Sequence, residues 1–149
     1  IFKINQLITN QTTRRDRVME YHIIGGDTKE EKIHFYRICD LVELAENYKR
    51  HNFRFLDTDY SPKEIISWRG SYCLPAIEYC GDKINGKQLA KVLKKGLSSI
   101  HTGYKGGDYR YNDDDEFYIA NYGSSSEYKV VGYENKDNEI ILLTRIDRY

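Results

Sequence analysis

Cysteine, proline and methionine are scarce in this chain of 149 residues, which has three, two and one of them. Cys39, Cys73 and Cys80 form no Cys-x-x-Cys pair, so the usual spacing of a structural zinc site is excluded and reduced thiols are expected. Long hydrophobic runs are also lacking: the longest aliphatic run covers residues 140–143, whereas a membrane-spanning helix needs roughly 20 apolar residues. No stretch has the basic start and apolar centre of a signal peptide.

Net charge is absent, because 23 basic residues balance 23 acidic ones. The balance conceals a segregation: residues 83–107 hold six basic residues and no acidic one, and residues 108–149 hold ten acidic and five basic residues. Such segregation allows opposed electrostatic fields on one surface. Hydrophobic residues make up 40% and charged residues 31%, which is typical of a globular protein, and the length suits a single domain over residues 1–149.

Two helices are predicted from capping patterns. Residues 28–31, Thr-Lys-Glu-Glu, have the hydroxyl and the carboxylate of a capping box, and they predict a helix over 29–50. Asn85 and Gln88 have the same spacing at the start of a second predicted helix over 85–101. The apolar residues of the second segment recur on one face, which is typical of an amphipathic helix.

Strands are predicted by short β-branched and aromatic runs bounded by turn residues. They cover residues 18–24, 53–56, 71–80, 117–122, 127–134 and 139–146. Residues 57–62 are expected to form a loop, and the last three strands an antiparallel meander. The sequence therefore predicts an α+β fold: a mainly antiparallel twisted sheet with two helices packed on one face.

Three short clusters combine aromatic rings with hydrogen-bonding groups, at residues 67–72, 103–109 and 119–123. Rings can stack on a planar group, a guanidinium or ammonium can grip an anion, and glycine lets the backbone approach it closely. The predicted ligand or partner site consists of Trp68, Arg69, Tyr72, Tyr104, Lys105, Gly106, Gly107, Asn121 and Tyr122. In the alternative interpretation Trp68 anchors the core and the glycines only form turns.

The second predicted helix has a basic face opposite its apolar face. Its lysines are Lys87, Lys91, Lys94 and Lys95. Lysines on one face can contact successive phosphates, which gives salt-sensitive binding to nucleic acid without sequence preference. The alternative is a solvated helix face that only aids solubility.

Patterns of catalytic residues are missing. The four histidines are scattered, there is no His-Glu-x-x-His or Gly-x-Ser-x-Gly, and residues 103–108 lack the Gly-Lys-Ser/Thr of a P-loop. We therefore expect a non-catalytic protein with no cofactor and no metal site. Residues 113–116, Asp-Asp-Asp-Glu, are expected to form a solvated turn, and they leave open a divalent cation or a mimic of nucleic-acid phosphates.

The blocks SWRGSY (67–72), GYKGGDY (103–109) and IANYG (119–123), in this order around an amphipathic helix, resemble a set of small bacteriophage-encoded proteins of unknown function. The resemblance covers about residues 65–145, and the sequence departs from the pattern at residues 73–75, Cys-Leu-Pro. The resemblance lends no activity. It implies a phage accessory protein that acts in the host cytoplasm.

These observations favour one function and leave two others open. The first is a non-catalytic phage accessory protein that binds and inhibits a host protein, such as a CRISPR effector or another defence component. The second is binding or modification of a nucleotide or another small anionic ligand at the three clusters. The third is nucleic-acid binding through the lysine face. No membrane partner is expected.

Overall fold

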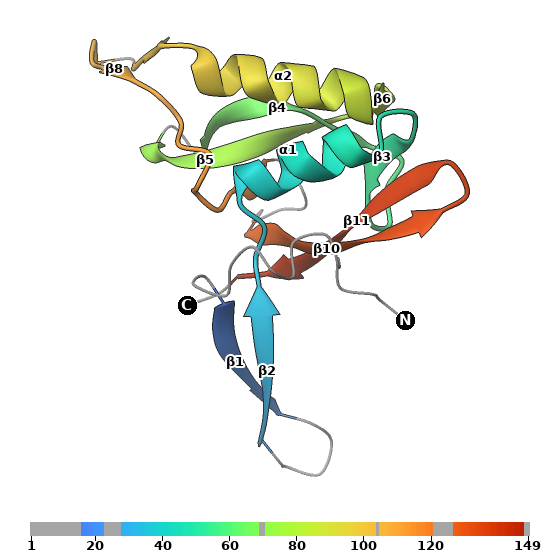
Figure 1. The fold of residues 1–149 in the computed structure, drawn as a ribbon. Helices are drawn as coiled ribbons and strands as arrows, with labels where there is room; N and C mark the ends of the chain where they lie inside the picture. Colours follow the sequence, from blue (N-terminus) through green and yellow to red (C-terminus); the bar gives the residue numbers. More distant parts are fainter. Residues whose placement is uncertain (1–15, 23–27, 69–70, 104, 121–126, 148–149) are drawn as a thin grey trace.

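The computed structural model describes residues 16–22, 28–68, 71–103, 105–120 and 127–147 of the chain (Figure 1). Over these residues the fold is α+β, as the sequence predicts. The helices are α1 (Ile38–Asn47) and α2 (Gly86–Ser98). The strands are β1 (Asp16–His22), β2 (Thr28–His34), β3 (Asn52–Phe55), β4 (Ser61–Trp68), β5 (Ser71–Cys80), β6 (Ile84–Asn85), β7 (His101–Thr102), β8 (Asp108–Tyr109), β9 (Tyr118–Ala120), β10 (Tyr128–Lys136) and β11 (Glu139–Ile146).

The described strands form four sheets, two of which contain a parallel pair. The largest has the order β10-β11-β3-β6, with β3 parallel to β11. The next has the order β4-β5-β9, with β9 parallel to β5. The hairpins β1–β2 and β7–β8 are antiparallel. The predicted meander is therefore wrong except for its last hairpin, β10–β11, because β9 joins β5 instead of β10.

The second predicted helix is confirmed, with its cap. The Asn85 side chain accepts a hydrogen bond of 2.9 Å from the Gln88 N–H, and the Gln88 side chain accepts one of 3.0 Å from the Asn85 N–H. Both bonds satisfy donors that the first turn of a helix leaves without a partner. Leu89 and Leu93 are fully buried, so the apolar face is the one that packs on the core.

The first predicted helix begins later than expected, and its first part is wrong. Residues 28–34 form β2, paired with β1 along its whole length, and α1 starts only at Ile38. The actual cap lies at Arg37, whose N–H donates a 2.9 Å hydrogen bond to Asp40 Oδ2. A capping box is a local signal of about 1 kcal/mol, and pairing with a neighbouring strand overrides it.

β4 begins at Ser61, so the predicted loop over 57–62 is too long by its last two residues. Its burial does not alternate from residue to residue, because Lys63 and Glu64 are both exposed. Pro62 lies in β4, which is the edge strand of its sheet, where a missing N–H is tolerated. Neither feature gives the period of two by which a strand is recognised.

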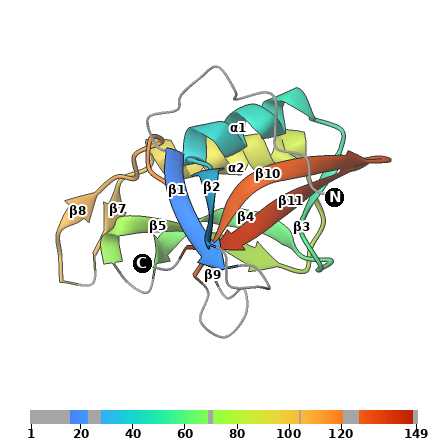
Figure 2. The same ribbon diagram turned by 90° about the horizontal axis from the view of Figure 1, so that it is seen from below.

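The main core lies between the helices and the strands. Figure 2 shows both helices on the same side of the strands. The fully buried residues of this core come from both helices and both larger sheets. They include Leu41, Leu44, Phe53, Phe55, Ile77, Leu89, Leu93, Ile140 and Leu142. Gly86 permits the close approach of α1 and α2, because an added Cβ there would lie 2.3 Å from the Ala45 carbonyl oxygen.

The hairpin β1–β2 projects from this body as an arm (Figure 1). Its base is anchored by Ile33 and Phe35, which pack with Val131 and Leu143 in a separate buried cluster. The Tyr36 N–H donates a 2.8 Å hydrogen bond to the Val130 carbonyl, which ties the chain after the arm to β10. The arm is therefore fixed at its base by packing and by the backbone.

Candidate functional site

A groove with a volume of about 470 Å³ lies along α2, where β4, β5 and β6 adjoin the helix. Pro62, Ile84 and Val92 line it and give it an apolar floor. The lysines that line it come from three parts of the chain: Lys63 of β4, Lys83 of the turn before β6, and Lys91 and Lys95 of α2. Asp82 is the only acidic residue among the described lining residues. The groove thus combines an apolar floor with a positive rim, and we call it the lysine groove.

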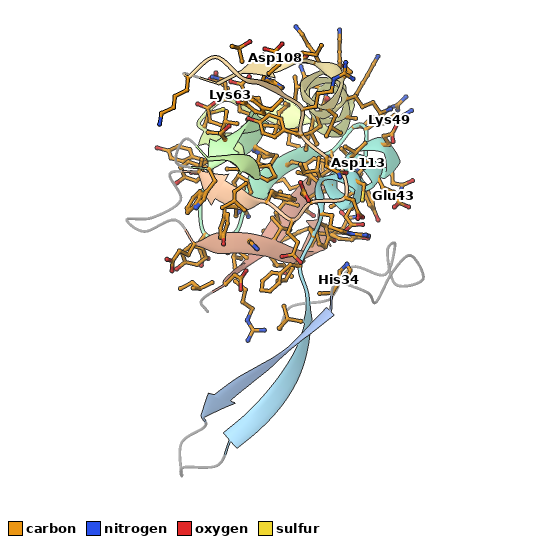
Figure 3. All side chains as sticks on the ribbon, turned by 90° about the vertical axis from the view of Figure 1, so that its left-hand side faces the viewer. His34, Glu43, Lys49, Lys63, Asp108 and Asp113 are labelled. Carbon is orange, nitrogen blue, oxygen red and sulfur yellow. The ribbon has the colours of Figure 1, made fainter. Side chains whose placement is uncertain are left out.

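Helix geometry decides which lysines of α2 reach the lysine groove. Residues 88, 91, 92 and 95 line it, and this spacing of three and four places them on one side of the helix. Lys94 instead forms an ion pair with Glu46 of α1, and Lys87 is exposed at the first turn. The predicted lysine face is therefore divided between the groove, helix α1 and solvent. Figure 3 shows the nitrogen-tipped side chains gathered along α2.

Lys63 and Lys83 also line the groove, although the sequence pattern does not predict them as site residues. Lys63 is more than half exposed and lies 4.0 Å from Glu78 Oε2, so its ammonium group stays largely in solvent. Only the tertiary arrangement of β4 and β6 against α2 brings these lysines to the helix. The one signal in the sequence was the run of basic residues over 83–107, which includes Lys83.

One or two described members of each aromatic cluster, namely Ser67, Trp68, Tyr109 and Ala120, meet at the end of β4. Ser67 Oγ lies 3.1 Å from Tyr109 Oη and 2.9 Å from Tyr111 Oη. Trp68 stacks on Tyr118, with ring centroids 4.3 Å apart, and packs with Ala120. Hydroxyl hydrogen bonds therefore join the first cluster to the second, and the packing of Trp68 joins it to the third.

Of the predicted ligand site, Arg69, Tyr104, Asn121 and Tyr122 lie outside the described residues, and Tyr72 belongs to β5. Trp68 is 9% exposed and contributes to a buried cluster.

The turn between β7 and β8 holds the remaining members of that predicted site. Lys105, Gly106 and Gly107 are exposed there. Gly106 has a φ of +95°, a conformation that favours glycine, and its N–H donates a 2.9 Å hydrogen bond to the Gly103 carbonyl. The Gly106 N–H is therefore engaged within the turn instead of facing a bound anion.

The hydroxyl cluster of Ser67, Tyr109 and Tyr111 has the properties of a structural tie. Burial raises the pKa of Tyr111 to about 12, and the neighbouring Tyr109 hydroxyl contributes in the same direction. The His101 ring centroid lies 4.7 Å from that of Tyr111, but His101 Nε2 pairs with the Gly96 carbonyl at 3.0 Å. Tyr111 therefore stays neutral well above pH 7, and its hydrogen bond with Ser67 connects this part of the chain to β4.

The acidic turn over residues 113–116 packs against the start of α1. The Cys39 N–H donates a 2.8 Å hydrogen bond to the Asp113 carbonyl, and Arg37 Nη1 donates one of 2.8 Å to Asp114 Oδ1. Figure 3 shows Asp113 beside α1. The expectation of a solvated hairpin tip is therefore only partly right: Asp113 is exposed, but the backbone of the turn and the Asp114 carboxylate bind the start of α1. The turn supplies acceptors and negative charge at a helix N-terminus, where both stabilise the helix.

Two buried ion-pair groups surround the base of the arm. Asp40 is fully buried: burial raises its pKa, but the His34 ring and the Arg37 backbone and guanidinium lower it more, so its pKa lies below the ordinary range. Lys129 Nζ lies 2.9 Å from Glu116 Oε1 and 2.8 Å from Asp147 Oδ2. These charges are enclosed and paired, so removal of one partner leaves an uncompensated buried charge.

Three comparisons with known proteins, namely with protein-family models, with curated proteins and with solved structures, find no match to this chain. Among the described residues, no helix has the length and apolar character that crossing a membrane requires. Within the same residues, no three histidine, cysteine, aspartate or glutamate side chains are grouped to hold a metal ion.

Proposed function

We propose that this protein is a non-catalytic nucleic-acid-binding protein and that the lysine groove is its binding site. The observation that carries the proposal is the convergence of Lys63, Lys83, Lys91 and Lys95 on one groove with a single carboxylate, Asp82, among the described lining residues. A ligand that presents several phosphates along a chain satisfies such an arrangement, because each lysine neutralises one phosphate and releases a condensed counterion.

The geometry distinguishes a site from a solvated basic helix. Lysines on one helix face alone are common on protein surfaces, and they define no concave site. Here Lys63 and Lys83 line the groove from outside α2, together with Lys91 and Lys95 of the helix and with apolar residues. Lysines gathered around one concave site raise the local potential there and attract an anion into it.

The test is a binding titration of the full chain with a fluorescently labelled oligonucleotide at several salt concentrations. For a single strand, each lysine–phosphate contact contributes about 0.7 to the slope of log K against log salt concentration, so Lys91→Gln together with Lys95→Gln lowers the slope by about 1.4. Lys87→Gln together with Lys94→Gln is the matched control, because it removes the same two charges from the same helix outside the groove. No binding at low salt, or an equal loss in the control, contradicts the proposal.

A second function, binding and inhibition of a host protein, is favoured by the projecting arm. Within the part of the chain that the structure describes, no third strand pairs with β1 or β2. An open strand edge can add a strand from another protein through main-chain hydrogen bonds.

Single proline substitutions at Val18 and Met19 test this second function. Neighbouring N–H groups of a strand point in opposite directions, so one substitution removes a bond to β2 and the other removes a donor at the open edge. Only the variant that loses the donor at the open edge is expected to abolish capture of a host protein while keeping its thermal stability. The variant that loses a bond to β2 is expected to lose stability. If neither substitution reduces capture, the arm is not the docking edge.

A further inference from the structure

The floor of the lysine groove carries information that its charge does not. Ile84 and Val92 are half-buried and the buried Pro62 also lines the groove, so apolar side chains share its lining with the lysines. Phosphates alone would be served by a polar floor. A groove lined by both lysines and apolar side chains fits a ligand that joins a phosphate to a flat apolar group.

The groove volume of about 470 Å³ limits what can enter. It lies in the range of pockets that hold small molecules, roughly 300–1,000 Å³. A nucleotide unit, with one base and one phosphate, is an occupant of this class. In a duplex the bases are stacked and paired inside the helix, so only the sugar–phosphate backbone can approach the groove, and the floor stays uncovered.

A neighbouring hollow shows that the positive charge is local. It shares Lys83 with the lysine groove, but Asp59 and Glu139 line it together with Arg54, and Glu139 forms an ion pair with Arg54 at 3.2 Å. Positive and negative side chains balance there. A polyanion held at the lysine groove is therefore attracted less by the surface on the side of this hollow.

From these observations we infer that the lysine groove binds single-stranded nucleic acid in preference to duplex, with one nucleotide seated in it. The base lies on the apolar lining, to which Ile84 and Val92 contribute half-buried side chains, and the flanking phosphates contact Lys63, Lys83, Lys91 and Lys95. The inference rests on the proposed function. It adds the strandedness of the ligand and the role of the floor. Contact of the base with aliphatic side chains is sequence-tolerant, because every base has an apolar face.

Competition with three small molecules tests the role of the floor. A labelled single strand bound to the full chain is displaced by a nucleoside monophosphate, by ribose 5-phosphate or by inorganic phosphate. The inference predicts that the nucleoside monophosphate displaces the strand at a concentration at least about tenfold below the other two, since only it carries a base to cover the floor. Equal potency of all three overturns the inference, because the site then recognises phosphate alone.

Strandedness is tested with a single strand and a duplex of the same sequence and length. We expect the single strand to bind at least about tenfold more tightly at equal salt, and Val92→Phe, which fills the groove, to remove that preference without affecting duplex binding. Val92→Thr keeps the side-chain shape and makes the floor polar. It is expected to weaken the binding of the single strand by a smaller factor than Val92→Phe does. Circular dichroism and thermal unfolding verify that each variant is folded.

The outcomes separate this inference from the proposal on which it rests. Equal binding of duplex and single strand, lost on Lys91→Gln and Lys95→Gln, overturns the single-strand inference and retains nucleic-acid binding. Binding of neither form overturns both. The inference is also overturned if Val92→Phe weakens the binding of neither form while the lysine substitutions still do. That result would show that the ligand does not cover the groove floor.

Discussion

Arg37 and Asp114, which are 77 residues apart in the chain, form an ion pair of 2.8 Å that joins the start of α1 to the acidic turn. The Arg37 side chain is 2% exposed, and it also contacts the fully buried carboxylate of Asp40. One arginine thus connects the end of the arm, the N-terminus of a helix and a distant turn. The densest acidic segment of the sequence therefore contributes contacts to the fold.

The two carboxylates that contact Arg37 are expected to differ in their contribution to stability. Asp40→Asn leaves a buried arginine with one fewer charge partner, and breaking such a pair costs about 3–5 kcal/mol. Asp114→Asn should cost less, because the Asp114 side chain is 39% exposed and water replaces it. Urea unfolding of the two variants measures the difference. Equal losses would contradict the assignment of Asp40 as the main partner.

Acid is expected to destabilise the protein through Asp40. Its pKa in the folded state is lowered from 3.8, so the folded state favours the charged carboxylate more than the unfolded state does. The stabilisation is present above pH 3.8 and is lost as the pH falls through the lower folded-state pKa. The free energy of unfolding, measured from pH 6 to pH 2, should fall in this window by more in the parent protein than in Asp40→Asn. Parallel curves for the two proteins would show that Asp40 does not cause the effect.

Gly86→Ala is expected to destabilise the protein by about 3 kcal/mol or more. In an exposed helix the same change would stabilise by about 1 kcal/mol, but here the added Cβ would lie 2.2 Å from the Tyr48 carbonyl oxygen. Gly107→Ala is the matched control, since an added Cβ there meets nothing within 4 Å. Thermal unfolding should show a large decrease in midpoint for the first variant and none for the second. A stable Gly86→Ala variant would mean that α1 and α2 can move apart freely.

Lys129→Met is expected to destabilise by about 3–5 kcal/mol, because it leaves two buried carboxylates without their cation. The ammonium group also lies 4.5 Å from the centroid of the Tyr118 ring, and this contact is lost as well. Combining Lys129→Met with Glu116→Gln should recover part of the loss in urea unfolding. No recovery would show that the tyrosine contact, not the carboxylates, accounts for the effect.

Local signals in the sequence predicted α2 and β11 well. The side chains of Asn85 and Gln88 act within four residues of each other, and the range predicted for the last strand, 139–146, is the observed one. The start of α1 could not be predicted in the same way. Residues 28–34 have a helix-cap pattern, but pairing with β1 decides their conformation, and that pairing depends on other residues.

Only part of the candidate site could be predicted, because the rest of it also depends on packing between distant residues. The basic helix was visible in the sequence, but helix periodicity does not tell which lysines face a neighbouring element. The pairing of Lys94 with Glu46 and the approach of Lys63 depend on how α1 and β4 pack against α2. Parallel pairings such as β5 with β9 also join segments far apart in the chain, and no local pattern indicates them.

Cys80 allows the most direct test of the central claim, because this half-buried cysteine lines the lysine groove. Alkylation of the full chain with and without a saturating single-stranded oligonucleotide is followed for each cysteine-containing peptide by mass spectrometry. Cys39 lies at the start of α1 outside the described groove lining, and burial raises the pKa of its thiol, so it serves as the slow internal reference. Binding in the groove predicts that the oligonucleotide slows the alkylation of Cys80 at least about tenfold and leaves the rate at Cys39 unchanged. Saturating oligonucleotide with an unchanged rate at Cys80 would contradict the claim that this groove is the nucleic-acid-binding site.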